Sequence, residues 1–126
     1  MSTGTIKEWA KAYMRAQLAH GLNTDHADWW AVEKFMKIGM KEEATASESW
    51  EAILMILELD PPDKVIAILA AGPLEDLIDD CGEEYVDRIE HEAKFNLKFR
   101  HLLGGVWKSS TPDVWARIEK IRGETW

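Results

Sequence analysis

The side chains of this sequence that could do chemistry are one cysteine, four histidines and a dense run of carboxylates. Cys81 is the only thiol, so it cannot form an internal disulfide, and Asp80 and Glu83 stand close to it in the chain. Negative neighbours and an apolar setting both disfavour the thiolate that a nucleophilic cysteine needs. We therefore expect Cys81 to be buried and slow to react with thiol reagents, and we assign no catalytic residue.

A metal site is the second chemistry to consider. Asp87 and His91 stand four residues apart on one predicted helix, and His101 could approach from the next helix. Carboxylate and imidazole ligands can together hold a divalent cation. A helical di-iron site, however, needs a Glu-x-x-His pair on each of two helices, and Arg88 stands where that glutamate would be. The sequence therefore predicts a solvated helix face here, with no metal and no cofactor.

Acidic residues crowd the segment from 75 to 84. Their spacings of three and four place them on one face of a helix, opposite an apolar stripe that includes Leu77, Ile78 and Cys81. Such a surface can steer and dock a protein partner with a basic surface. The predicted partner-binding residues, called the acidic run below, are Glu75, Asp76, Asp79, Asp80, Glu83 and Glu84.

Seven tryptophans make the composition unusual for a chain of 126 residues. Flat indole rings can stack on a ligand, and the candidates for an aromatic ligand pocket are Trp29, Trp30, Trp50 and Trp107. Most tryptophans nevertheless fall on apolar helical stripes, which favours a role in the core. We expect Trp9, Trp50 and Trp115 to be buried, and Trp126 to be the most exposed.

The elements that must position these residues are helices, because apolar side chains recur at helical spacing along the whole chain. Cap residues and glycines set the expected boundaries. Gly72 should end one helix and Pro73 should begin the next, where Glu75 and Asp76 would meet the positive end of the helix dipole. Gly82 should end that helix in turn. The expected helices cover residues 6–20, 25–38, 45–59, 61–71, 73–81, 83–95, 97–103 and 112–122.

The sequence thus predicts an all-α fold of about eight short helices, forming one domain over residues 1–126. Short connections favour antiparallel hairpins, arranged as a compact bundle or as a short stack resembling helical repeats. The longest apolar stretch, residues 65–71, is too short to span a membrane. The net charge of −8 opposes binding to nucleic acid. With a lone cysteine and no secretory signal at its start, the chain is expected in the cytoplasm.

Two strings carry a resemblance to a known family. Ala-Gly-Pro-Leu-Glu-Asp-Leu stands at residues 71–77, and Leu-Leu-Gly-Gly-Val-Trp stands at residues 102–107. With these strings the chain resembles a family of small bacterial all-α domains of unknown function. The resemblance implies a compact helical domain, and it implies no activity and no catalytic residue.

Two function hypotheses follow from these features. The first is a small acidic cytoplasmic module that binds a basic protein partner through the acidic run, in the manner of an inhibitor or of an immunity protein that neutralises a toxin. The alternative is a small enzyme or ligand-binding domain with a tryptophan-lined pocket.

Overall fold

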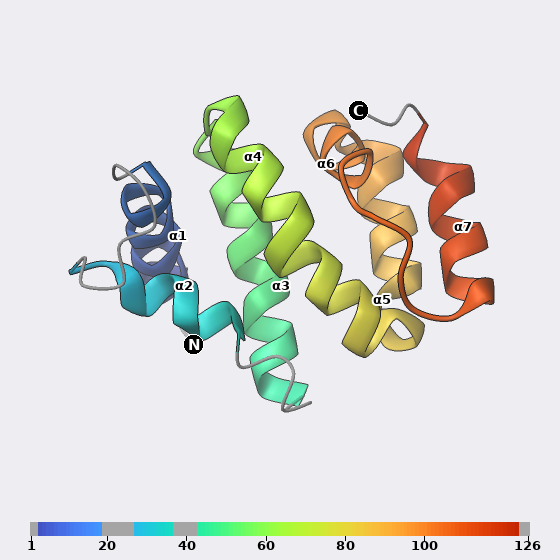
Figure 1. Cartoon of the computed structure of the whole chain (residues 1–126), viewed down its shortest axis with the longest axis horizontal. Coiled ribbons are helices and arrows are strands. Elements are labelled where there is room, and N and C mark those ends of the chain that lie inside the picture. Colours follow the sequence, from blue (N-terminus) through green and yellow to red (C-terminus); the bar gives the residue numbers. More distant parts are fainter. Residues whose placement is uncertain (1–2, 19–26, 37–42, 124–126) are drawn as a thin grey trace.

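The computed structural model describes residues 3–18, 27–36 and 43–123, and these residues form helices and the turns between them, with no strand (Figure 1). The all-α prediction is confirmed. The predicted helix ends at Gly21 and Gly39 lie outside the described residues, as does Trp126. In chain order the elements are α1 (Thr3–Leu18), α2 (Trp29–Met36), α3 (Glu43–Glu58), α4 (Asp63–Leu69), the π-helical segment η2 (Ala70–Leu74), α5 (Glu75–Phe95), α6 (Leu97–Leu103) and α7 (Pro112–Arg122).

The helices pack as a bundle with α1 and α2 at one end, α6 and α7 at the other, and α3 with the α4–α5 run between them (Figure 1). Helix α3 contacts α1 on one side and η2, α5 and α6 on the other. A helix with neighbours on both sides must be apolar around most of its circumference. None of the described helices is long and apolar enough to cross a membrane.

Cap residues set the boundaries of the two last helices as the sequence predicts. The Asn96 side chain accepts hydrogen bonds from the backbone N–H groups of Lys98 and Phe99, at the start of α6. The Thr111 hydroxyl accepts one from the Val114 N–H, at 3.3 Å, where α7 begins. Caps of this kind satisfy N–H groups that have no partner within the helix.

The predicted helix stop at Gly72 is wrong. The chain passes from α4 through η2 into α5 without leaving the helical conformation, so one long helical run extends from Asp63 to Asp80. The local stop signal at Gly72 is overridden because the flanking turns carry side chains that the core buries, as at Leu74 and Leu77. The break predicted near Gly82 is present, since a kink at Cys81, whose backbone angles (φ −131°, ψ 20°) are not helical, divides α5 into two helices.

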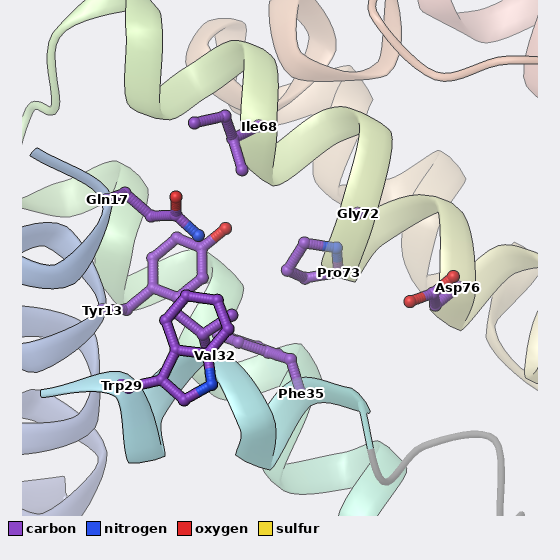
Figure 2. Close-up of a pocket in the computed structure, with 9 residues that line it drawn as sticks. All are labelled: Tyr13, Gln17, Trp29, Val32, Phe35, Ile68, Gly72, Pro73 and Asp76. Atoms are coloured by element: carbon purple, nitrogen blue, oxygen red, sulfur yellow. The ribbon is translucent and has the colours of Figure 1, made fainter. Parts of the chain in front are cut away.

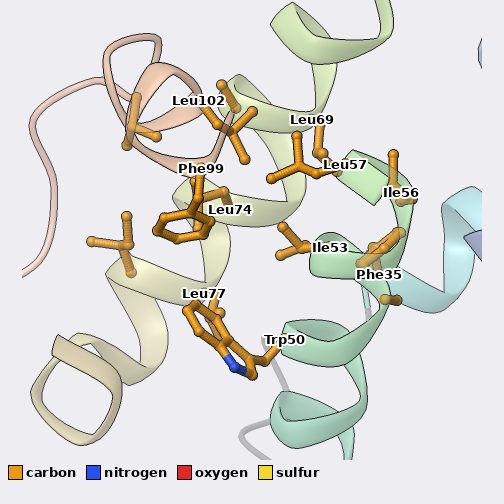
Figure 3. Close-up of a cluster of buried hydrophobic side chains, with 14 of the residues drawn as sticks. Phe35, Trp50, Ile53, Ile56, Leu57, Leu69, Leu74, Leu77, Phe99 and Leu102 are labelled. Atoms are coloured by element: carbon orange, nitrogen blue, oxygen red, sulfur yellow. The ribbon is translucent and has the colours of Figure 1, made fainter. Parts of the chain in front are cut away.

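Aromatic and aliphatic side chains from α3, η2, α5 and α6 meet at the centre of the bundle (Figure 3). The Trp50 ring lies 5.4 Å from the ring of Phe99 and 6.0 Å from the ring of Tyr85, measured between centroids. Leu74 and Leu77 are fully buried around them. Burying such a side chain contributes about 1.5–3 kcal/mol, so this cluster holds the halves of the bundle together.

Candidate functional site

A pocket of about 370 Å³ opens between the N-terminal helix pair and the long helical run (Figure 2). Helices α1 and α2 form one wall, while α4, η2 and the first turn of α5 form the other. The side chains of the lining are apolar except for a hydroxyl, an amide, one carboxylate and the indole N–H of Trp29. The lining residues are Tyr13, Gln17, Trp29, Val32, Phe35, Ile68, Gly72, Pro73 and Asp76.

The first wall is held in place by an aromatic cluster. The indole N–H of Trp9 donates to the Ala31 carbonyl at 2.8 Å, which fixes α1 against α2. The Phe35 ring packs against the Trp9 ring, with 4.5 Å between centroids, and meets the Tyr13 ring edge-on at 5.1 Å. Tyr13 and Phe35 therefore reach the pocket as rigid side chains.

The second wall depends on the π-helical turn. A π-helical turn contains about one more residue than an α-helical turn, and such turns are frequent at functional sites. Pro73 sits inside it, although a proline in a regular helix clashes with the preceding turn and lacks the N–H that the helix needs. Gly72 stands before that proline, and at this position a side chain would disfavour helical angles. The Gly72-Pro73 pair thus allows the helix to continue and forms part of the pocket wall.

The Tyr13 hydroxyl is the unusual polar group of the pocket. Tyr13 is 1% exposed, and its hydroxyl makes no hydrogen bond of standard geometry. The Gln17 side chain lies beside it (Figure 2). Burial raises the pKa of Tyr13, and the polar contact with Gln17 opposes that rise. The phenol is therefore neutral at physiological pH and keeps hydrogen-bonding capacity beyond its contact with Gln17.

This observation predicts the effect of a small substitution. Tyr13→Phe should change the free energy of unfolding by less than about 1 kcal/mol, because the buried hydroxyl has only its contact with Gln17 to lose. Urea unfolding of the two proteins would measure the difference. Tyr85→Phe is the control, since the Tyr85 hydroxyl interacts with Ser47 and its removal should have a similarly small effect. A loss well above about 1 kcal/mol in Tyr13→Phe alone would show that its hydroxyl is fully hydrogen-bonded in solution.

Asp76 is the only acidic or basic side chain among the described residues that line the pocket. Its side chain is exposed, but the surrounding protein removes part of the water around its carboxyl and thereby raises the pKa, and repulsion from Asp80, Glu75 and Asp79 raises it further. No basic side chain forms an ion pair with Asp76 within the described residues. None of these residues therefore compensates the negative charge at this edge of the pocket.

The acidic run lies on α5 as predicted, opposite the buried Leu77, Ile78 and Cys81. Asp76, Asp79, Glu83 and Glu84 are exposed, whereas Glu75 and Asp80 are partly buried. Part of the run borders a shallow hollow beside residues 110–111, where the Ser110 N–H donates to an Asp79 carboxylate oxygen at 3.2 Å. Only Asp76 of the run also reaches the apolar pocket.

The four tryptophans proposed as candidates for an aromatic pocket do not come together, and Trp29 is the one of them that lines the described pocket. Trp30, the next residue, is 44% exposed and does not line it. Trp50 is in the core, and Trp107 is 76% exposed beyond α6. The physical reason is helical geometry, since adjacent residues such as 29 and 30 point about 100° apart. The predicted burial of Trp9, Trp50 and Trp115 is confirmed.

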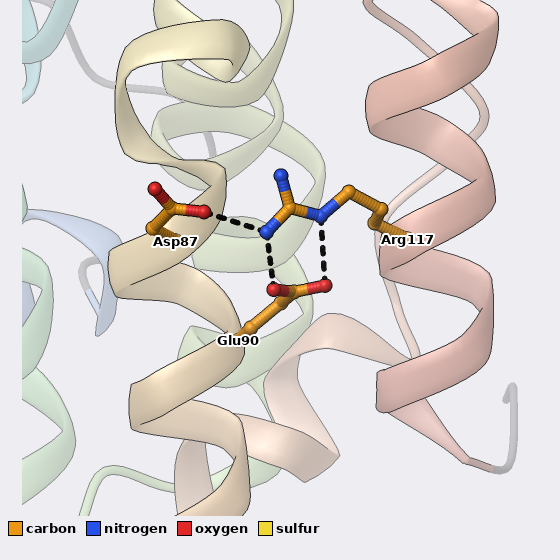
Figure 4. A network of polar contacts seen from close by, with 3 residues as sticks. All are labelled: Asp87, Glu90 and Arg117. Carbon is orange, nitrogen blue, oxygen red and sulfur yellow. Dashed lines mark hydrogen bonds and ion pairs between the residues drawn. The ribbon is translucent and has the colours of Figure 1, made fainter.

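The histidine and the carboxylates considered as metal ligands make other contacts. Arg117 of α7 donates two hydrogen bonds to the Glu90 carboxylate and one to Asp87, at 2.6 Å (Figure 4). These bonds lower the pKa of Glu90. His91 instead packs on the Phe95 ring, at 4.9 Å between centroids. Among the residues that the structure describes, no three His, Cys, Asp or Glu side chains are grouped to hold a metal.

Residues 19–125 match the model of a family described as a family of unknown function (DUF6869). No curated protein and no solved structure matches the chain. The matched range contains α2 and the long helical run, so it includes the pocket residues from Trp29 to Asp76. Tyr13 and Gln17 precede it in the chain. Sequence reasoning missed both residues, because Tyr13 and Gln17 fit the ordinary apolar stripe of a helix.

Proposed function

Since the chain belongs to this family of unknown function, DUF6869, we propose its function from the pocket. We propose that the protein binds a small, largely apolar ligand between α1, α2 and the π-helical turn. The observation that carries the proposal is the Tyr13 hydroxyl, which is buried at the pocket, makes no hydrogen bond of standard geometry and has only the Gln17 side chain beside it (Figure 2). A buried polar group that is incompletely hydrogen-bonded is unfavourable, so proteins rarely keep one. A ligand oxygen or nitrogen would supply a further partner.

The size and lining of the pocket support the same function. A volume of about 370 Å³ lies at the small end of the roughly 300–1,000 Å³ that is typical of ligand sites. Trp29, Val32 and Phe35 offer an apolar surface to a ring system, and Gln17 is only partly buried above Tyr13, so its side chain can turn to admit a ligand. One or two fused rings with a polar substituent would fit.

Naphthalenemethanol is a suitable neutral probe, because it combines two fused rings with one hydroxyl. We expect saturable changes in the NMR signals of the residues that line the pocket, with a Kd on the order of 0.1–1 mM for a ligand of this size. Trp29→Ala should weaken binding by about tenfold, because it removes one apolar wall. Tyr13→Phe should weaken it by roughly threefold to tenfold, since it removes one hydrogen bond.

Trp30→Ala is the matched control, because Trp30 is adjacent to Trp29 on α2 but lies outside the pocket. It should leave the Kd unchanged. Equal weakening by the Trp29 and Trp30 variants would contradict the proposed site. Absence of saturable binding by naphthalene probes of every charge would contradict the proposed function.

A second candidate function is docking of a basic protein surface on the acidic run, in the manner of an inhibitor or an immunity protein. It is supported by six carboxylates within ten residues, none of which forms an ion pair with another part of the chain that the structure describes. Desolvation raises the pKa of Asp76, and repulsion from Asp80, Glu75 and Asp79 raises it further. A basic partner would relieve that repulsion, with an association rate that falls as salt rises.

The second candidate is tested with a short oligolysine peptide and two variants of equal charge. One variant neutralises Asp79, Glu83 and Glu84, and the other neutralises Glu8, Glu33 and Glu51, which are exposed on three different helices. The first should lose about tenfold more affinity than the second at low salt. Equal losses would show that net charge, and not this surface, attracts the peptide.

The bacterial origin and the cytoplasmic location implied by the sequence belong to this proposal as well. Support for the location comes from the lone, buried Cys81, which has no second cysteine in the chain with which to pair.

A further inference from the structure

The charge of the pocket lining restricts what kind of ligand it can hold. Among the described residues, Asp76 is the one lining residue with an acidic or basic group, and no described Lys, Arg or His lines the pocket. An anionic ligand would meet an uncompensated carboxylate, whereas a cationic ligand would meet a counter-ion. Three further carboxylates, on Glu75, Asp79 and Asp80, act on Asp76 and extend the negative potential around it.

The backbone does not neutralise Asp76 either. A carboxylate in the first turn of an isolated helix is stabilised by free N–H groups and by the helix dipole. Here α5 continues directly from η2, and the Glu75 N–H already donates to a carbonyl of the preceding turn, that of Ala70. The dipole stabilisation that the sequence predicts for Glu75 and Asp76 is therefore lost, because no helix begins at Pro73.

The rest of the lining suits the apolar part of a cationic molecule. Phe35 and Pro73 lie between Tyr13 and Asp76 in the pocket, and the Trp29 ring lies beside Tyr13 (Figure 2). Aromatic faces attract ammonium groups as well as apolar carbon. An ammonium near Asp76 would thus lie beside apolar and aromatic surface, while the body of the molecule covers Val32 and Ile68.

We infer that the ligand of this pocket is a hydrophobic amine, whose ring system packs on Trp29 and Phe35 and whose protonated nitrogen pairs with the Asp76 carboxylate. This inference rests on the proposed function and narrows it to one chemical class. It is separate from docking on the acidic run, because it uses Asp76 alone among those six residues.

Three probes of nearly equal shape test it: naphthalenemethylamine, naphthalenemethanol and naphthoate, which are cationic, neutral and anionic at pH 7. The amine should bind about tenfold more tightly than the alcohol, and naphthoate should bind most weakly. In Asp76→Asn the amine should bind no more tightly than the alcohol. The Kd of the alcohol should stay within about twofold of its value for the unaltered protein, which would show that the pocket is intact. Increasing salt should weaken the amine alone.

Asp79→Asn is the matched control, because it removes the same charge from the neighbouring turn of α5 but does not line the pocket. In this control variant the amine should still bind more tightly than the alcohol. If the alcohol binds and the amine binds no more tightly, the inference is overturned while the proposed function stands. If Asp79→Asn removes the tighter binding of the amine as fully as Asp76→Asn does, the summed negative charge of the acidic run attracts the cation. The assignment of the ion pair to Asp76 would then be wrong.

Discussion

Trp9→Ala should lower the free energy of unfolding by about 3–5 kcal/mol, the range measured for large aromatic side chains removed from packed cores. Trp9 is completely buried between α1 and α2. Its indole N–H donates to the Ala31 carbonyl, its ring packs on Phe35, and the ammonium of Lys34 lies 4.7 Å from the ring centroid. Alanine would leave a cavity that these neighbours cannot fill.

Urea unfolding with a fluorescence or circular dichroism signal would measure this loss. Trp30→Ala is the control, because Trp30 is 44% exposed and a surface substitution should change stability by less than about 0.5 kcal/mol. The Trp9 variant should also lose naphthalenemethanol binding, since Trp9 and Phe35 support the wall that contains Tyr13. A loss below about 1 kcal/mol would mean that α1 is not packed as described.

The positions of the tryptophans illustrate what sequence periodicity can predict. Trp9, Trp50 and Trp115 repeat in register with aliphatic neighbours, and all three are buried. Periodicity reports which side of a helix faces the core. It does not report which helices meet, so it could not show that Trp29 lines a pocket while Trp50 packs between α5 and α6.

The pocket could not be predicted because its parts are distant in the chain. Tyr13 and Asp76 are 63 positions apart, and they share a pocket through the packing of α1 against α4. The Tyr13 hydroxyl carries no signal in the sequence, since a tyrosine on an apolar stripe ordinarily finds a hydrogen-bond partner of standard geometry. Its burial at the pocket beside Gln17, without such a bond, is a property of the packed structure alone.

Gly72 and Gly82 show how a local signal can have another cause. Gly72 does not end a helix, because it precedes Pro73 in a continuous helical run, whereas Gly82 directly follows the kink that divides α5. Neither has the positive φ that a helix-ending glycine commonly adopts, which among the described glycines occurs only at Gly123. At Gly82 the missing side chain makes room for a neighbouring segment, and the sequence around it contains no sign of that neighbour.

Gly82→Val should therefore lower the free energy of unfolding by about 1–3 kcal/mol, the usual effect of adding atoms to a packed site. A Cβ atom at this position would lie 2.5 Å from the Ser110 hydroxyl oxygen and 3.0 Å from a methyl carbon of Val114. Both distances are shorter than van der Waals contact, and valine adds two methyl groups to that Cβ. The loop before α7, and α7 itself, would have to move away from α5.

Two further variants test whether the loss of stability comes from the close approach of residue 82 to Ser110. Ala116→Val adds the same two methyl groups to an exposed position of α7, and it should change stability by less than about 0.5 kcal/mol. Ser110→Gly removes the nearest obstructing atom at a residue with a positive φ of 66°, where glycine is favoured. Combined with Gly82→Val, it should recover part of the lost stability, because residues in contact have non-additive effects. Strict additivity of the two substitutions would show that Gly82 does not make room for Ser110, and the close approach of this loop to α5 would then be wrong.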